Sequence, residues 1–141
     1  MATVFGEPEA HPIASAVARI HTELDHLAEV GCWSLTGPEL ADSLTSLGAL
    51  RSRVTELELR VARQADRLDL GANHGATDTG SHWANTTRQT NRDAKRRLQL
   101  AHALDHDHEP VRDAMAAGTV SEEQAAVIVT GVDALPVEHR R

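Results

Sequence analysis

The chain has 141 residues, a formal net charge of −7 at pH 7, and 40% hydrophobic but only 2% aromatic residues. This length suits one domain that buries a core, and the shortage of aromatic side chains favours aliphatic helix packing over a β-rich fold. The single cysteine excludes an intrachain disulfide and a cysteine-based zinc site. We expect a cytoplasmic protein that does not enter the membrane, since no apolar run approaches bilayer length.

The N-terminal half predicts a long antiparallel helical hairpin over residues 12–70. After a disordered acidic lead-in at residues 1–11, apolar side chains recur every three or four residues over 12–30, as on one face of a helix. Thr36 and Glu39 then form a capping-box pattern, and a second apolar series follows. Its members are Leu40, Leu44, Leu47, Leu50, Val54, Leu57, Val61, Ala65 and Leu68. We expect this seam to pack on the first helix, and a second copy of the chain is the alternative partner.

The C-terminal half predicts short helices. A glycine-rich loop is expected at residues 71–80 and a short-helix cluster at 81–136. Capping signals are predicted at Ser81, at Thr90 with Asp93, and at Ser121 with Gln124. The first two helices of the cluster, with the tight turn between them, follow the plan of a helix-turn-helix.

The sequence therefore predicts an all-α fold of about six helices. We expect a single helical domain over residues 12–136, in which the long hairpin precedes the short-helix cluster. Residues 137–141 are predicted to be a truncated tail.

Positive charge gathers on one helix of this acidic chain. Residues 88–97 carry five positive charges and one negative charge, Asp93, and so sum to +4. At 100° per residue, Ala94, Leu98 and Ala101 face inward and the basic side chains face outward or lie on the flanks. The candidate nucleic-acid-binding residues are Arg88, Arg92, Lys95, Arg96, Arg97 and Gln99.

Two interpretations of this basic helix stay open. It is either a contact for double-stranded DNA or a solvated helix face, because a charged outer face is common in helical hairpins. The acidic remainder of the chain would oppose DNA over distances near a Debye length of about 10 Å. Trp83, just before the basic helix, either stacks on a base or fills space between helices.

No catalytic constellation is present in the sequence. Neither a G-x-S-x-G nor an H-E-x-x-H motif occurs, and the glycines of residues 71–80 follow a helix rather than a strand. His102 and His106 stand four residues apart, so they could chelate a metal, or they could favour the negative end of a helix dipole. We expect no enzyme activity, no metal and no cofactor.

Several segments in order resemble a known bacterial family. "RVARQAD", "GATDTGSHWANTTRQTNRDAKRRLQLAHALD" and "HEPVRDAMAAGTVSEEQAAVIVTGVDALP" look like domain of unknown function 222, the thirteen-E-twelve repeat family. The similarity covers roughly residues 40–136. It implies a helical domain of the kind that usually precedes a C-terminal HNH endonuclease domain. No residue of this chain matches the HNH motif, so no catalytic role is implied for it.

These observations support one leading hypothesis and two alternatives. The leading one is a non-catalytic helical module of an HNH-endonuclease-type protein that associates with DNA through the basic helix. The first alternative is a helical module for protein interaction or oligomerisation, whose partner is the HNH domain or a second copy of the chain. The second alternative is an inactive truncated remnant.

Overall fold

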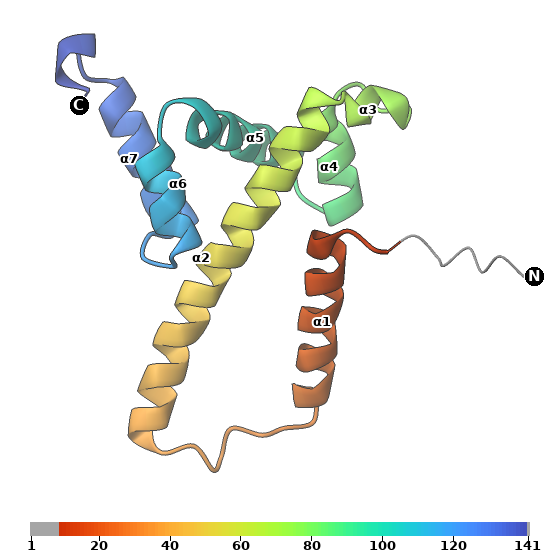
Figure 1. Cartoon of the computed structure of the whole chain (residues 1–141), viewed down its shortest axis with the longest axis vertical. Coiled ribbons are helices and arrows are strands. Elements are labelled where there is room, and N and C mark those ends of the chain that lie inside the picture. The colour runs from red at the N-terminus through yellow and green to blue at the C-terminus, as the bar shows by residue number, and fades with distance from the viewer. Residues whose placement is uncertain (1–8, 141) are drawn as a thin grey trace, which may run out of the picture. The chain divides into compact units, whose positions relative to one another are not determined.

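The computed structural model describes residues 9–140, and within them every regular element is a helix. The elements are α1 (Pro12–Leu27), α2 (Gly37–Arg67), α3 (Leu70–Asn73), α4 (Thr79–Thr87), α5 (Asn91–His106), α6 (Glu109–Ala116), α7 (Glu122–Asp133) and a 3₁₀ turn, Val137–His139 (Figure 1). The all-α fold class is thereby confirmed. Most of the lead-in predicted at residues 1–11 lies outside the described residues.

The chain divides into two compact units, Met1–Glu39 and Leu40–Arg141. Helix α1 belongs to the first unit and almost all of α2 to the second. Both predicted long helices therefore exist, whereas their pairing as an antiparallel hairpin stays a prediction. None of the helices within residues 9–140 has both the length and the apolar character that crossing a bilayer requires.

Local capping defines the ends of the elements in the first unit. The His11 ring accepts a hydrogen bond from the Ile13 N–H at 3.1 Å, and Pro12 occupies the first turn of α1. The helix ends at Leu27, earlier than predicted, because the Ala28 N–H bonds back to Asp25 and tightens the last turn. The predicted capping box before α2 is present, with Thr36 and Glu39 bonded reciprocally at 2.8 and 3.3 Å.

In the second unit, α2 packs through an unexpected face. Its buried residues are Ser52, Glu56, Leu59 and Ala62. The apolar seam predicted to be the packed face points away from the unit, with Leu44 73% exposed and Leu68 65% exposed. The expected partner of this seam is the first helix, which belongs to the other unit, so that packing stays a prediction.

Close backbone approach explains why the less apolar face is buried. The turn after α6 contains Gly118 at φ +80°, and a Cβ built there would lie 2.9 Å from the Cβ of Ala49 on α2. Only small side chains allow a turn to come so near a helix. The core of the unit then forms from aliphatic side chains of α2 and α5–α7: Leu59, Leu100, Ala101, Leu104, Met115, Ala125 and Val129.

The segment predicted as a glycine-rich loop, residues 71–80, is partly helical. It contains most of α3 and the first two residues of α4, and Gly71 lets the two helices approach each other closely. A Cβ at Gly71 would lie 2.1 Å from the backbone carbon of Asp78. The cap of α4 is Asp78 rather than the predicted Ser81, whose N–H instead donates to the Asp78 carboxylate at 2.7 Å. That backbone hydrogen bond, aided by the Ser81 side chain and the charge of Lys95, lowers the pKa of Asp78 below its ordinary 3.8.

The remaining helices begin and end largely as predicted. The Thr90 hydroxyl accepts from the Asp93 N–H at 3.1 Å, and Ser121 and Gln124 form a reciprocal capping box before α7. Helix α4 contacts α3 and α5, while α5, α6 and α7 contact one another. Instead of a bare tail, residues 137–139 form a 3₁₀ turn, after which Arg140 donates to the backbone carbonyl of Asp133 at 2.7 Å.

Candidate nucleic-acid interface

A tight turn joins α4 to α5 and fixes the direction of the basic helix. Helix α4 ends at Thr87, and its C-cap residue, Arg88, adopts a left-handed conformation at φ 59° and donates its N–H to the Ala84 carbonyl. The Gln89 N–H donates to the same carbonyl at 3.0 Å, and Thr90 then caps α5. Ala84 and Ala94 are fully buried between the two helices. The two helices and the tight turn between them are thus present, while their likeness to a helix-turn-helix and their use for DNA binding stay predictions.

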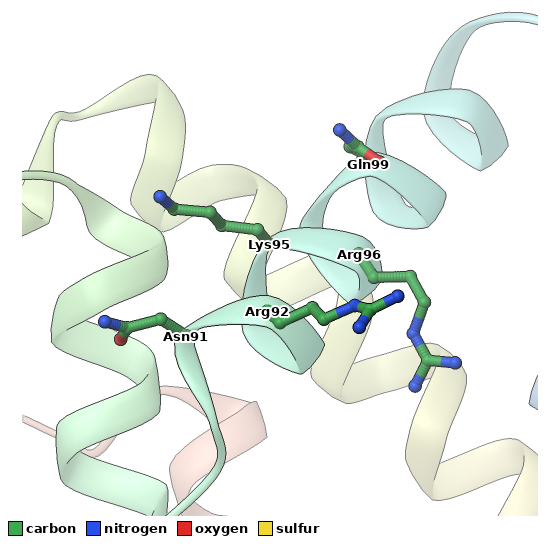
Figure 2. Close-up of a pocket in the computed structure, with 5 residues that line it drawn as sticks. All are labelled: Asn91, Arg92, Lys95, Arg96 and Gln99. Atoms are coloured by element: carbon green, nitrogen blue, oxygen red, sulfur yellow. The ribbon is translucent and has the colours of Figure 1, made fainter.

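The solvent face of α5 gathers five long polar side chains. An open surface hollow is lined by Asn91, Arg92, Lys95, Arg96 and Gln99, all of which are exposed (Figure 2). In Figure 2, Asn91 and Lys95 extend to one side of the helix, and Arg92 and Arg96 to the other. Four of these residues were predicted site residues. Asn91 was missed, although its place one helical turn before Lys95 was a signal that could have found it.

The positive charges of this face have few carboxylates near them. Within residues 9–140, no carboxylate lies within 4.0 Å of the Arg92 guanidinium or of the Lys95 ammonium. Arg96 approaches Asp93 at 3.4 Å, but the two side chains are 72% and 51% exposed, so water screens this pair strongly. The carbon stem of Lys95 lies beside Gly80, where an added Cβ would be 3.3 Å from its Cγ. These charges are therefore presented to solvent rather than used inside the unit.

Arg97 differs from its neighbours, since its side chain turns inward. Its guanidinium makes ion pairs with Glu58 on α2 at 2.6 Å and with Glu122 on α7 at 2.7 Å. It also donates to Gln89 at 3.0 Å and lies 4.8 Å from the centre of the Trp83 ring. Burial disfavours the charged form, but the two carboxylates outweigh it and raise the pKa of Arg97. The structure thus separates Arg97 from the other predicted contacts.

Trp83 lies inside the same arrangement. It is partly buried and packs against the core, with the Arg97 guanidinium above its ring. This position agrees with the space-filling interpretation rather than with a base-stacking platform. Arg88 remains exposed in the turn, outside the residues that line the hollow.

The histidines near the end of α5 bind separate carboxylates. His102 contacts Asp66 at 2.7 Å, and His106 lies 3.8 Å from Asp105. Burial would raise the pKa of Asp105, but the charges of Arg67, His106 and Arg63 outweigh it and lower that pKa. Within the described part of the chain, no three His, Cys, Asp or Glu side chains are arranged to hold a metal ion. Of these two contacts, the one between His102 and Asp66 ties α5 to α2.

Comparison with known proteins gives one match. Residues 14–141 match the family described as "Domain of unknown function (DUF222)". No curated protein and no solved structure matches the chain. The match covers every helix from α2 onward and nearly all of α1, and its description names no activity.

Proposed function

The chain belongs to the family described as Domain of unknown function (DUF222), and on that premise we propose a function from its α5 surface. The chain is a non-catalytic helical module that contacts the backbone of duplex DNA. It serves as the accessory part of an HNH-endonuclease-type protein. The contact residues are Arg92, Lys95 and Arg96, with Asn91 and Gln99 beside them.

One observation carries the DNA contact: α5 directs Arg92, Lys95 and Arg96 outward, whereas Arg97 on the same helix is neutralised within the unit. Arg92 and Lys95 have no carboxylate within 4.0 Å among residues 9–140, whereas Arg97 makes two ion pairs. From residue 91 to residue 99 the helix rises about 12 Å, which is comparable with the width of a major groove. Arginine and lysine bind phosphate, and the amides of Asn91 and Gln99 can donate to phosphate or to base edges.

The net charge of −7 limits how such a module binds. Repulsion between DNA and the acidic remainder acts over about 10 Å at 0.1 M salt, so the contact must be local. We expect modest affinity with a steep dependence on salt, as is usual for binding dominated by phosphate contacts.

The test is fluorescence anisotropy with a labelled DNA duplex at about 50 and about 200 mM salt. The wild-type chain binds at the lower salt, and Arg92→Ala/Arg96→Ala reduces affinity and lowers the salt slope by about 2. The matched control, Arg19→Ala/Arg53→Ala, removes two exposed arginines elsewhere and keeps the wild-type slope. Absence of binding by the folded chain at about 50 mM salt would overturn the DNA proposal.

The nuclease association has a separate test. It rests on the family resemblance, so we expect the native reading frame to continue beyond codon 141 into a segment with HNH ligands. A stop codon directly after Arg141 would contradict this part of the proposal and leave the DNA contact to its own experiment.

A further inference from the structure

The exposed face of α2 is a second surface that the DNA proposal does not use. Six apolar side chains of this face are at least two-fifths exposed: Leu44, Leu47, Leu50, Val54, Val61 and Leu68. They belong to the second unit, whose own core packs on the other side of α2 through Leu59 and Ala62. A continuous apolar surface of this kind marks an interaction site in soluble proteins.

The shape of the surface favours a helix as its partner. At 100° per residue, the seam from Leu47 to Leu68 stays within about 80° of the helix circumference. A narrow seam with spacings of three and four residues is the geometry into which a second helix packs, knobs into holes. A helix lying on a bilayer usually has a wider apolar face.

The charges beside the seam select the kind of helix. Arg51 and Arg53 flank it on either side, are exposed, and have no carboxylate within 4.0 Å among residues 9–140. Arg60 and Arg67 stand on the Arg53 side and remain about half exposed or more, but each is paired within the unit, Arg60 with Glu56 and Arg67 with Asp105.

The acids of α2 between residues 47 and 68 are each engaged by a basic side chain of the same unit. Glu56 is buried and bonded to Arg60, Glu58 to Arg97, and Asp66 to His102. From Leu47 to Leu68, the apolar seam therefore has on each side one arginine that makes no ion pair among residues 9–140, Arg53 and Arg51. Glu58 stands on the Arg51 side but is paired with Arg97.

We propose that this surface binds an amphipathic helix of another protein, one with an aliphatic stripe and glutamate or aspartate on both sides of it. Such a helix buries the seam and places carboxylates beside Arg51 and Arg53. A second copy of α2 fits less well. In an antiparallel pair, Arg53 and Arg60 would face Arg53 and Arg60 of the other copy, and like charges would repel. In a parallel pair, the arginines would need Glu58 of the other copy as their partner, but Arg97 already engages that carboxylate.

The experiment uses the full chain and two labelled synthetic peptides of four heptads, each with Leu at positions a and d. One peptide carries Glu at positions e and g, and the other carries Lys there. We expect the chain to bind the Glu peptide at least about tenfold more tightly than the Lys peptide. Arg51→Glu/Arg53→Glu should reverse that preference. The matched control, Arg92→Glu/Arg96→Glu, makes the same charge change on α5 and should keep it.

A third variant tests the seam itself. Leu50→Asp/Val61→Asp should abolish binding of both peptides while circular dichroism stays at the wild-type level, because neither residue is in the core. Equal binding of the two peptides overturns the proposal. Absence of binding overturns it as well, whether the seam is empty or covered by residues 12–27. A dimer in sedimentation velocity that Leu50→Asp/Val61→Asp dissociates would identify a second copy as the occupant and also overturn it.

Discussion

Helices α2 and α5 each carry small or apolar residues and arginines, yet they bury opposite kinds of face. In α5 the fully buried positions include Ala94 and Ala101, and Arg92 points to solvent. In α2 the aliphatic seam points to solvent, and a face containing Ser52 and Glu56 is packed. The difference shows that fit to neighbouring backbone, more than hydrophobicity, selects the packed face here. It also leaves α2 with an apolar surface for a different partner.

The largest expected contrast lies between the two faces of α2. Leu59 is 2% exposed, so Leu59→Ala should lower the free energy of unfolding by about 2–4 kcal/mol through lost burial and a cavity. Leu44 is 73% exposed, and Leu44→Ala should change it by less than about 0.5 kcal/mol. Urea unfolding followed by circular dichroism measures both. Similar losses for the two variants would show that the seam is part of the chain's own core.

The next contrast compares two arginines of α5. Arg97→Ala leaves Glu58 and Glu122 without their shared partner, and we expect a loss of about 2–3 kcal/mol in unfolding free energy. Arg92→Ala should cost less than about 0.5 kcal/mol, because its side chain is exposed and makes no ion pair among residues 9–140. The same urea measurement applies. A loss for Arg92→Ala as large as that for Arg97→Ala would contradict the division of α5 into an inner and an outer face.

The smallest effect is expected at the turn between α4 and α5. Arg88 holds a left-handed conformation, which costs a residue with a Cβ roughly 1–2 kcal/mol. Arg88→Gly relieves that strain but adds freedom to the unfolded chain, so stability should rise by no more than about 1 kcal/mol. Thermal unfolding measures the change, and Arg88→Ala, which keeps the strain, is the control. A marked loss for Arg88→Gly alone would mean that the Arg88 side chain supports the turn.

Much of the fold follows from local sequence signals. The caps at Thr90 and Ser121 act within three residues, so the sequence alone locates the starts of α5 and α7. The start of α4 was misplaced, because Asp78 and Ser81 both suit a cap and only the approach of α3 at Gly71 selects Asp78.

The candidate site was also predicted only in part, because the sequence shows local signals but not contacts between distant segments. Helical periodicity correctly predicted that Arg92 and Arg96 point outward. It could not reveal that Arg97 would meet Glu58 and Glu122, which are 39 residues before it and 25 residues after it in the chain. Contacts between distant segments depend on packing, which neither spacing nor composition encodes. The buried face of α2 was missed for the same reason, because its burial depends on the close approach of the turn at Gly118, which is distant in the sequence.

Lys95 is the only lysine in the sequence. Its stem lies beside Gly80 and its ammonium belongs to the exposed α5 surface. An amine-reactive dye or cross-linker therefore modifies one side chain, apart from the terminal amino group, and that side chain lies within the surface of interest. Labelling of Lys95 is therefore a direct assay of this surface, because a bound polyanion would protect the ammonium from the reagent.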